Sequence, residues 1–226
     1  MKGITRLGLI LAIFAAVGCA ALAVVYSVTE SAIAMQSEKA LNESLKNIFP
    51  DAESFEDVSS TVSSSVEGIA FEQAFLVKTA LAPLGLAVKA TGSSYGGAAK
   101  LLVGVNLNRS IAGVSVLELN DTAGLGANAK NAGYFVKKAE KITFPGQFAG
   151  KFITEAFEVK KDVVAITAST ITSKSLTRII KTAAAAAAQW LENSTVAPVV
   201  ATATATATAE SQPAAAGTTA ETTGGK

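Results

Sequence analysis

Five hydroxyl side chains cluster between residues 167 and 173, at the start of a stretch with helical periodicity. The first N–H groups of a helix have no partner inside the helix, and the positive end of the helix dipole lies there. Such a helix start can bind a phosphate group, and Lys174 and Arg178, one turn apart, could add positive charge. The alternative is an ordinary N-cap, in which Thr170 or Thr172 bonds to the next turn. The five hydroxyl residues are Thr167, Ser169, Thr170, Thr172 and Ser173.

The rest of the composition excludes most catalytic machinery. The chain has 226 residues, no histidine and one cysteine, Cys19. Ser-His-Asp catalysis, histidine-ligated metals, intramolecular disulfides and iron–sulfur ligation are therefore excluded. The formal net charge of +1 provides no basic surface for a nucleic acid, so we expect no nucleic-acid partner. Any chemistry must use hydroxyls, carboxylates, amines or a bound cofactor.

An uncharged run over residues 7–28 predicts a membrane-spanning helix near the N-terminus. As a helix it is about 33 Å long, enough to cross a bilayer core of about 30 Å. Lys2 and Arg6 precede the run and Glu30 follows it, which places the N-terminus in the cytoplasm and the remainder outside. The run contains no acid or base, so we expect no ion path through this helix.

Two other interpretations of this run remain open. A cleaved secretory signal has a shorter apolar core and a small-residue cleavage site, and this run lacks an obvious Ala-x-Ala exit. Residues 16–19, Ala-Val-Gly-Cys, resemble a lipoprotein processing site that would lipidate Cys19, yet the chain stays apolar beyond it. An uncleaved anchor with Cys19 as a small apolar residue agrees best with the length.

Beyond the span, the pattern indicates mixed helix and strand. Apolar spacing predicts a helix over residues 38–49, ended by Pro50, and a loop over 51–65. A helix is also expected over 172–193, where Leu176, Ile179, Ile180 and later residues recur at helical spacing. Short β-rich runs predict strands over residues 69–77, 84–91, 100–105, 111–119, 152–159 and 163–166.

The connections are rich in glycine and polar residues. A hairpin turn is expected at residues 106–109, a glycine-rich loop at 122–133 and irregular structure at 142–150. From residue 195 the chain is alanine and threonine of low complexity, with too few large side chains to offset the entropy of ordering. We therefore predict a disordered tail over residues 195–226.

The hydroxyl cluster resembles the flavinylation motif of the FMN-binding domain found in the G subunit of Rnf-type electron transport complexes. That motif, which also occurs in the C subunit of the Na⁺-translocating NADH:quinone reductase, is roughly D-x-x-[ST]-G-A-T-x-[ST]. Thr167 matches the first hydroxyl position, Thr170 the threonine that is esterified to the FMN phosphate, and Thr172 the last position. Three positions depart from the pattern: Val164 stands for the aspartate, Ala168 for the glycine and Ser169 for the alanine.

Other segments resemble the same domain in the same order. Residues 94–105 (SYGGAAKLLVGV) are similar to a glycine-led strand, and residues 121–126 (DTAGLG) to an E-T-P-G-L-G loop. Residues 147–151 (QFAGK) match the segment before the flavin strand. The resemblance implies FMN held covalently at Thr170 through a phosphoester. It implies these further flavin-pocket residues: Tyr95, Thr122, Gly124, Leu125, Gly126, Thr167, Ala168, Ser169, Ile171 and Thr172.

The resemblance implies an α+β fold, with one transmembrane helix followed by an extracytoplasmic FMN-binding domain that has an antiparallel sheet and packed helices. The expected divisions are 1–30 for the start and span, 31–66 for a connector, 67–194 for the FMN-binding domain and 195–226 for the tail. The implied location is the bacterial inner membrane.

The implied function is that of a redox-carrier subunit, without substrate turnover of its own, in a ferredoxin:NAD oxidoreductase type of complex. The implied partners are the other membrane subunits and a flavin transferase that attaches FMN. Three alternatives stay open: the C subunit of a quinone reductase, FMN bound without a covalent link, and a non-redox envelope protein that interacts through its tail.

Overall fold

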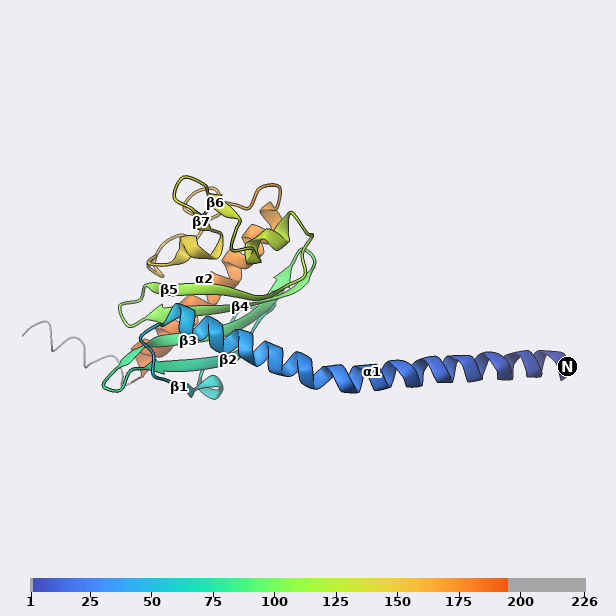
Figure 1. Ribbon diagram of the computed structural model, residues 1–226. Coiled ribbons are helices and arrows are strands. Elements are labelled where there is room, and N and C mark those ends of the chain that lie inside the picture. Colours follow the sequence, from blue (N-terminus) through green and yellow to red (C-terminus); the bar gives the residue numbers. More distant parts are fainter. Residues whose placement is uncertain (1, 195–226) are drawn as a thin grey trace, which may run out of the picture.

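A computed structural model describes residues 2–194, so the predicted disordered tail lies outside the described residues. A sheet lies between two helices that differ greatly in length (Figure 1). The long helix α1 projects far beyond the domain, and the shorter helix α2 packs on the opposite face of the sheet. The fold is therefore α+β, as predicted.

Helix α1 (Lys2–Ile48) is continuous over its whole length. At a rise of 1.5 Å per residue it is about 70 Å long. It is the one helix among the described residues that is long and apolar enough to cross a membrane. The helix predicted at 38–49 is present as the last three turns of α1, continuous with the apolar run before it. The sequence offers no break, because its first proline is Pro50.

The sheet is an antiparallel meander in which each strand pairs with the next along the chain, in the order β1-β2-β3-β4-β5. The four strands predicted between residues 69 and 119 are present, the first three longer than predicted, and the expected turn joins the last two. The first strand was missed, because it lies in the segment predicted as a loop. The strands are β1(Ser54–Asp57), β2(Ile69–Lys78), β3(Pro83–Ser94), β4(Gly97–Asn106) and β5(Ile111–Leu119).

Helix α2 (Thr170–Asn193) begins two residues before its predicted start and covers one face of the sheet. Its apolar stripe, predicted from the spacing of Leu176, Ile179 and Ile180, is fully buried. It packs against alternate residues of the strands, among them Leu86 and Val103, as the two-residue period of a strand requires. This interface is the main core of the domain.

The opposite face of the sheet carries the last turns of α1. Leu41, Leu45 and Phe49 form a second, smaller core with Leu102 and Val77. Gly104 of β4 permits the close approach of the helix, since a Cβ there would lie 2.4 Å from the side chain of Ile48. A rigid helix therefore joins the apolar N-terminal run directly to the sheet.

The segment between β5 and α2 folds mostly into turns. The strands predicted over 152–159 and 163–166 were wrong, because only isolated bridges form, at Phe152 and between Val159 and Val163. Phe157 and Lys160 adopt positive φ, which interrupts an extended ladder. The regular pieces here are the 3-10 turns η2 (Gly126–Lys130) and η3 (Pro145–Phe148) and the short strands β6 (Phe135–Lys137) and β7 (Ile142–Thr143); η1 (Ser59–Thr61) follows β1.

Candidate functional site

A pocket of about 410 Å³ opens where α2 begins. One wall is the start of α2 with the residues just before it, and the others are the β3–β4 turn and the loop after β5. These parts gather at the end of the domain from which α1 projects (Figure 1). The volume lies within the usual range for ligand pockets, about 300–1,000 Å³.

The wall made by α2 presents free hydrogen-bond donors. Thr170 is the first residue of the helix, and Ser169, at the N-cap, makes no side-chain capping bond. Within residues 2–194, no hydrogen bond engages the N–H groups of Thr170, Ile171 and Thr172 or the hydroxyl of Thr170. The predicted alternative of an ordinary N-cap by Thr170 or Thr172 is therefore wrong. This helix start can accept an anion, and it exposes a free hydroxyl beside that anion.

The backbone before α2 turns sharply into the helix. Ala168 has φ of 57°, in the left-handed region that glycine adopts with least strain. The turn is anchored on both sides: the N–H of Thr167 donates to the hydroxyl of Tyr134 (3.2 Å), and the N–H of Ile166 donates to Oγ of Ser173 (3.0 Å). The glycine of the flavinylation motif thus corresponds to a position whose conformation favours glycine.

The carboxylate of Asp121 joins the three walls of the pocket. It accepts hydrogen bonds from Oγ of Ser94 (2.8 Å), the N–H of Gly96 (2.7 Å) and Oγ1 of Thr172 (2.5 Å). Asp121 and Thr172 are both buried. Gly126 lies against this group, and a Cβ there would approach Oδ2 of Asp121 and Oγ1 of Thr172 to 2.6 Å. The Asp121 carboxylate therefore fixes α2 to the sheet and needs glycine at position 126.

Apolar side chains surround the mouth of the pocket. Tyr95 is 66% exposed, Ile171 61% and Leu125 41%, although each is large and apolar or aromatic. Leaving such surface in water is unfavourable unless a ligand or a partner covers it. Free donors on one wall and an apolar rim around them are suited to a ligand with a phosphate and a flat ring system, as FMN has.

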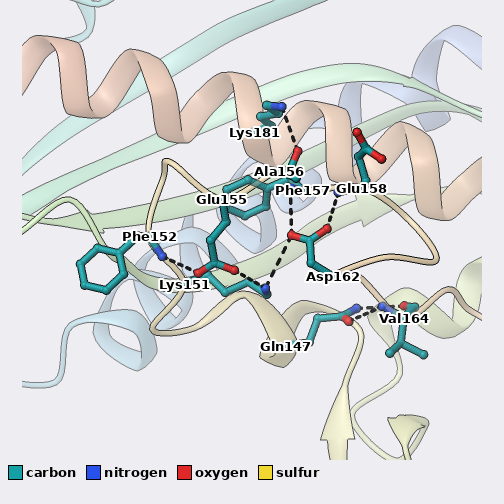
Figure 2. Close-up of polar contacts among 10 residues, drawn as sticks. All are labelled: Gln147, Lys151, Phe152, Glu155, Ala156, Phe157, Glu158, Asp162, Val164 and Lys181. Atoms are coloured by element: carbon teal, nitrogen blue, oxygen red, sulfur yellow. Dashed lines mark hydrogen bonds and ion pairs between the residues drawn. The ribbon is translucent and has the colours of Figure 1, made fainter.

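The loop before α2 is held by polar contacts that the sequence did not predict (Figure 2). The side-chain amide of Gln147 accepts from the N–H of Val164 (2.8 Å) and donates to the carbonyl of Val164 (3.1 Å). The backbone of Val164 is therefore fixed, while its side chain is 40% exposed. The position where the motif has aspartate thus presents its side chain toward solvent.

The carboxylate of Asp162 makes its contacts within the same loop, so Asp162 cannot replace the aspartate of the motif. It accepts from the N–H groups of Phe157 (2.9 Å) and Glu158 (2.6 Å) and pairs with Lys151 (Figure 2). Burial by itself raises the pKa of Asp162, but the N–H donors of Glu158 and Phe157 and the charge of Lys151 outweigh it and hold the pKa below its ordinary value.

The structure brings most of the sequence-predicted site residues into one pocket. Gly124 and Thr167 do not line it: Gly124 has φ of 77° in the turn beside Leu125, and Thr167 is exposed in the turn before α2. Lys174 and Arg178 line a different cavity, so the expectation that they add charge near the helix start is wrong. The predicted residues that line the pocket are Tyr95, Thr122, Leu125, Gly126, Ala168, Ser169, Thr170, Ile171 and Thr172.

Asp121, Ser94 and Gln147 were not predicted as site residues. The only sequence signal for Asp121 is its place at the start of the run 121–126. Its three donors come from distant parts of the chain. Across residues 2–194, no group of three or more His, Cys, Asp or Glu side chains is arranged to hold a metal ion.

Comparison with known proteins decides the family. Residues 1–48 match the RnfG N-terminal region, and residues 94–185 match the FMN-binding domain. The chain is 31% identical over 196 residues to the G subunit of the Na(+)-translocating ferredoxin:NAD(+) oxidoreductase complex of Acetobacterium woodii, covering 78% of this chain and 87% of that protein. The chain belongs to the RnfG family.

Other relatives carry similar names. The G subunit of the proton-translocating ferredoxin:NAD(+) oxidoreductase complex of Clostridium ljungdahlii is 29% identical, over 72% of this chain and 80% of that protein. The G subunit of the ion-translocating oxidoreductase complex of Escherichia coli is 28% identical, over 81% of this chain and 90% of that protein. The FMN-binding domain match includes the β3–β4 turn, the loop after β5 and the start of α2, and so contains every wall of the pocket.

Proposed function

We propose that the chain is the G subunit of a membrane-bound, ion-translocating electron transport complex of the ferredoxin:NAD oxidoreductase type. In this proposal it carries FMN, joined through a phosphoester to Oγ1 of Thr170. The observation that carries it is the free hydroxyl of Thr170, beside unpaired N–H groups at the start of a helix and within the matched FMN-binding domain.

Different residues of the pocket would hold different parts of the cofactor. The N–H groups of Ile171 and Thr172 would bind phosphate oxygens, with the positive end of the α2 dipole behind them. The apolar surfaces of Tyr95 and Leu125 would cover the ring and exclude water from it. When bound, FMN supplies the redox chemistry that the side chains of this protein lack.

The position of the pocket supports exchange of electrons with membrane-embedded neighbours. It lies at the end of the domain from which α1 leaves (Figure 1). α1 is continuous, so no flexible linker separates the pocket from the apolar run. In the proposed topology, Lys2 and Arg6 hold the N-terminus in the cytoplasm, and the flavin domain faces the outside of a bacterial inner membrane.

The attachment site is tested by intact mass of the full chain, coexpressed with a flavin transferase and purified in detergent. We expect the wild type to gain the mass of FMN less one water, and Thr170→Ala to gain nothing. Thr182→Ala is the matched control, because Thr182 lies on α2 beyond the motif and does not line the pocket; it should retain the added mass. Equal modification of Thr170→Ala and the wild type would refute the site.

The departure at Val164 favours a second candidate, in which the same pocket binds FMN without a covalent link. Acid precipitation separates the two proposals, since it would then release all the flavin into the supernatant. Val164→Asp restores the motif at an exposed side chain whose backbone is held by Gln147. If the aspartate is read by the transferase, this variant should increase the covalent fraction without changing the fold.

The topology and the partners need separate tests. Protease added to intact spheroplasts should degrade the flavin domain, and protection of the domain would refute its placement outside. Copurification of other membrane subunits with a tagged full chain tests assembly. Isolation of the chain alone, with a function that depends on residues 195–226 and survives Thr170→Ala, would favour the non-redox envelope protein.

A further inference from the structure

A second cavity, of about 720 Å³, lies between α1 and the sheet. One side is a single face of α1 from Thr29 to Ala40. The other side belongs to β3, β4, the end of β5 and the 3-10 turn η2. The cavity shares no lining residue with the flavin pocket, and the proposed function does not use it.

The cavity begins where the uncharged run ends. Thr29 directly follows the last residue of that run, and the distance along α1 from Thr29 to Ala40 is about 16 Å. The headgroup layer on each side of a bilayer is about 5–8 Å thick, from a total of about 40–45 Å and a core of about 30 Å. With residues 7–28 across the core, Thr29 and Ile33 lie at headgroup level, and the cavity extends along α1 to Ala40, about 18 Å beyond the core.

The wall opposite α1 is cationic. Lys89 pairs with Glu72 at 2.8 Å, and Lys100 pairs with Glu118 at 2.8 Å. Lys130 donates to the carbonyl of Leu117 (2.7 Å) and has no carboxylate partner within residues 2–194. These three lysines are matched by two glutamates, so this wall of the cavity carries a net charge of +1.

The remaining lining is apolar or uncharged. Ala32 and Ile33 of α1 face Leu117 of β5 across the cavity. The hydrogen bond to Glu118 raises the pKa of Lys100, so its ammonium group stays protonated at neutral pH. The cavity therefore has an apolar part at the level of the bilayer surface and a positively charged part beside it.

We propose that this cavity holds the headgroup of an anionic phospholipid from the membrane that α1 crosses. The phosphate lies beside Lys100 and Lys130, and the glycerol and first acyl carbons follow Ala32 and Ile33 toward the bilayer. Charge complementarity and the level of the Thr29–Ile33 end of the cavity select this occupant, because Lys130 has no carboxylate partner among the described residues and a neutral transmembrane helix would offer it none. The inference rests on α1 spanning the membrane, as in the proposed function.

The lipid site is close to the flavin pocket. Glu118 lines the cavity and Thr122 lines the pocket, four residues later. Their Cα atoms are therefore at most about 14 Å apart. A bound lipid would hold the loop that carries Thr122 and Leu125 near the membrane surface.

Native mass spectrometry of the full-length chain tests the proposal. The detergent-solubilised protein receives equal amounts of phosphatidylglycerol and phosphatidylcholine with identical acyl chains. We expect selective retention of phosphatidylglycerol by the wild type. Each lysine near a membrane surface contributes about fivefold to anionic lipid binding, so Lys100→Gln/Lys130→Gln should retain roughly 25-fold less. Lys138→Gln/Lys174→Gln removes the same charge from exposed positions elsewhere and should behave as the wild type.

A second variant keeps every charge in case the double lysine variant fails to fold. Ala32→Phe fills the cavity from the exposed surface of α1 and should also lose phosphatidylglycerol. Equal retention of the two lipids by the wild type, or equal loss from both double variants, overturns the proposal. Release of the chain from membranes by alkaline carbonate would instead refute the membrane anchor itself.

Discussion

The two faces of the sheet are covered by helices that bury very different amounts of side chain. Against α2, large residues such as Leu86, Leu101 and Val103 are fully buried along the whole helix. Against α1 the buried patch is smaller: Val77, Ala87 and Leu102 pack on its last turns, and Gly104 lets the helix approach closely. Farther along the α1 face the residues become charged: Lys89 lies two positions beyond Ala87, and Lys100 lies two positions before Leu102.

The two interfaces therefore have different roles: one stabilises the fold of the domain, and the other sets the position of the domain relative to α1. The α2 face holds the domain together and carries the pocket at its helix start. The α1 face is a short apolar contact that changes to charged residues where the helix extends beyond the domain. We therefore predict that substitutions at the α2 interface lower the unfolding free energy more than equivalent substitutions at the α1 interface.

The largest expected difference comes from matched leucines. Leu176→Ala on α2 should cost about 4 kcal/mol of unfolding free energy, because Leu176 is fully buried in the main core. Leu41→Ala on α1 should cost about 2 kcal/mol, because Leu41 lies at the edge of the small cluster, where the site can relax. Denaturant unfolding of the full chain in detergent, followed by the fluorescence of its single tryptophan, Trp190, measures both. Equal costs would contradict the comparison.

Loss of the Asp162 carboxylate should cause the next largest decrease in unfolding free energy. Asp162→Asn should cost about 2 kcal/mol at pH 7, the usual contribution of hydrogen bonds to a charged acceptor. The depressed pKa of Asp162 means that its contribution is complete above about pH 4, the unfolded value, and is lost as the pH falls through the folded pKa. The wild type should therefore lose stability in acid more steeply than the variant.

The control for that pH profile is Asp51→Asn, which changes an exposed aspartate near the end of α1. Its acid profile should follow the wild type. A profile of Asp162→Asn as steep as that of the wild type would show that another group causes the acid sensitivity.

Replacing Ala168 should stabilise the turn into α2. Ala168→Gly relieves the left-handed backbone at φ of 57°, and after the added unfolded-state entropy of glycine we expect a gain of roughly 0.5–1 kcal/mol. The same change at Ala185, exposed in the middle of α2, should instead cost about 1 kcal/mol. Thermal unfolding compares them, and the same sign at both positions would contradict the assigned conformation.

The smallest expected effect lies on the α1 face. Oγ of Ser44 on α1 and Oγ of Ser115 on β5 are 2.9 Å apart and share a hydrogen bond. Ser44→Ala should cost about 0.5 kcal/mol, and adding Ser115→Ala should cost little more, because the pair is then removed together. A double-mutant cycle in the full chain measures the coupling. Strictly additive costs would show that the two hydroxyls act independently.

The elements with a clear apolar period could be predicted from the sequence. The strands from β2 to β5 follow from apolar runs between turn residues, and the buried stripe of α2 follows from apolar residues at helical spacing. β1 could not, because its four residues are polar apart from Phe55, and its pairing partner, β2, decides its conformation. The runs at 152–159 and 163–166 have strand composition, but the contacts of Asp162 fold them into turns.

From the sequence, only the site residues that lie within the recognised motifs could be predicted. The start of α2 and the run 121–126 supply most of the pocket, and both were singled out by residue type. The role of Asp121 was not predictable, because its carboxylate binds donors 27, 25 and 51 residues away. Relatives named for Na⁺ and for protons are 31% and 29% identical to this chain, so similarity alone does not distinguish the coupling ion.

Because α1 is unbroken, a tilt of its apolar part displaces the whole domain at its other end. About 30 Å of helix separates the end of the uncharged run from Ile48, with no hinge residue between them. Transmembrane helices adopt tilts over a wide range, and a change of about 10° would carry the domain sideways by roughly 5 Å. In the proposed topology, helices that pack around α1 inside the bilayer would thus set the position of the flavin pocket from a distance.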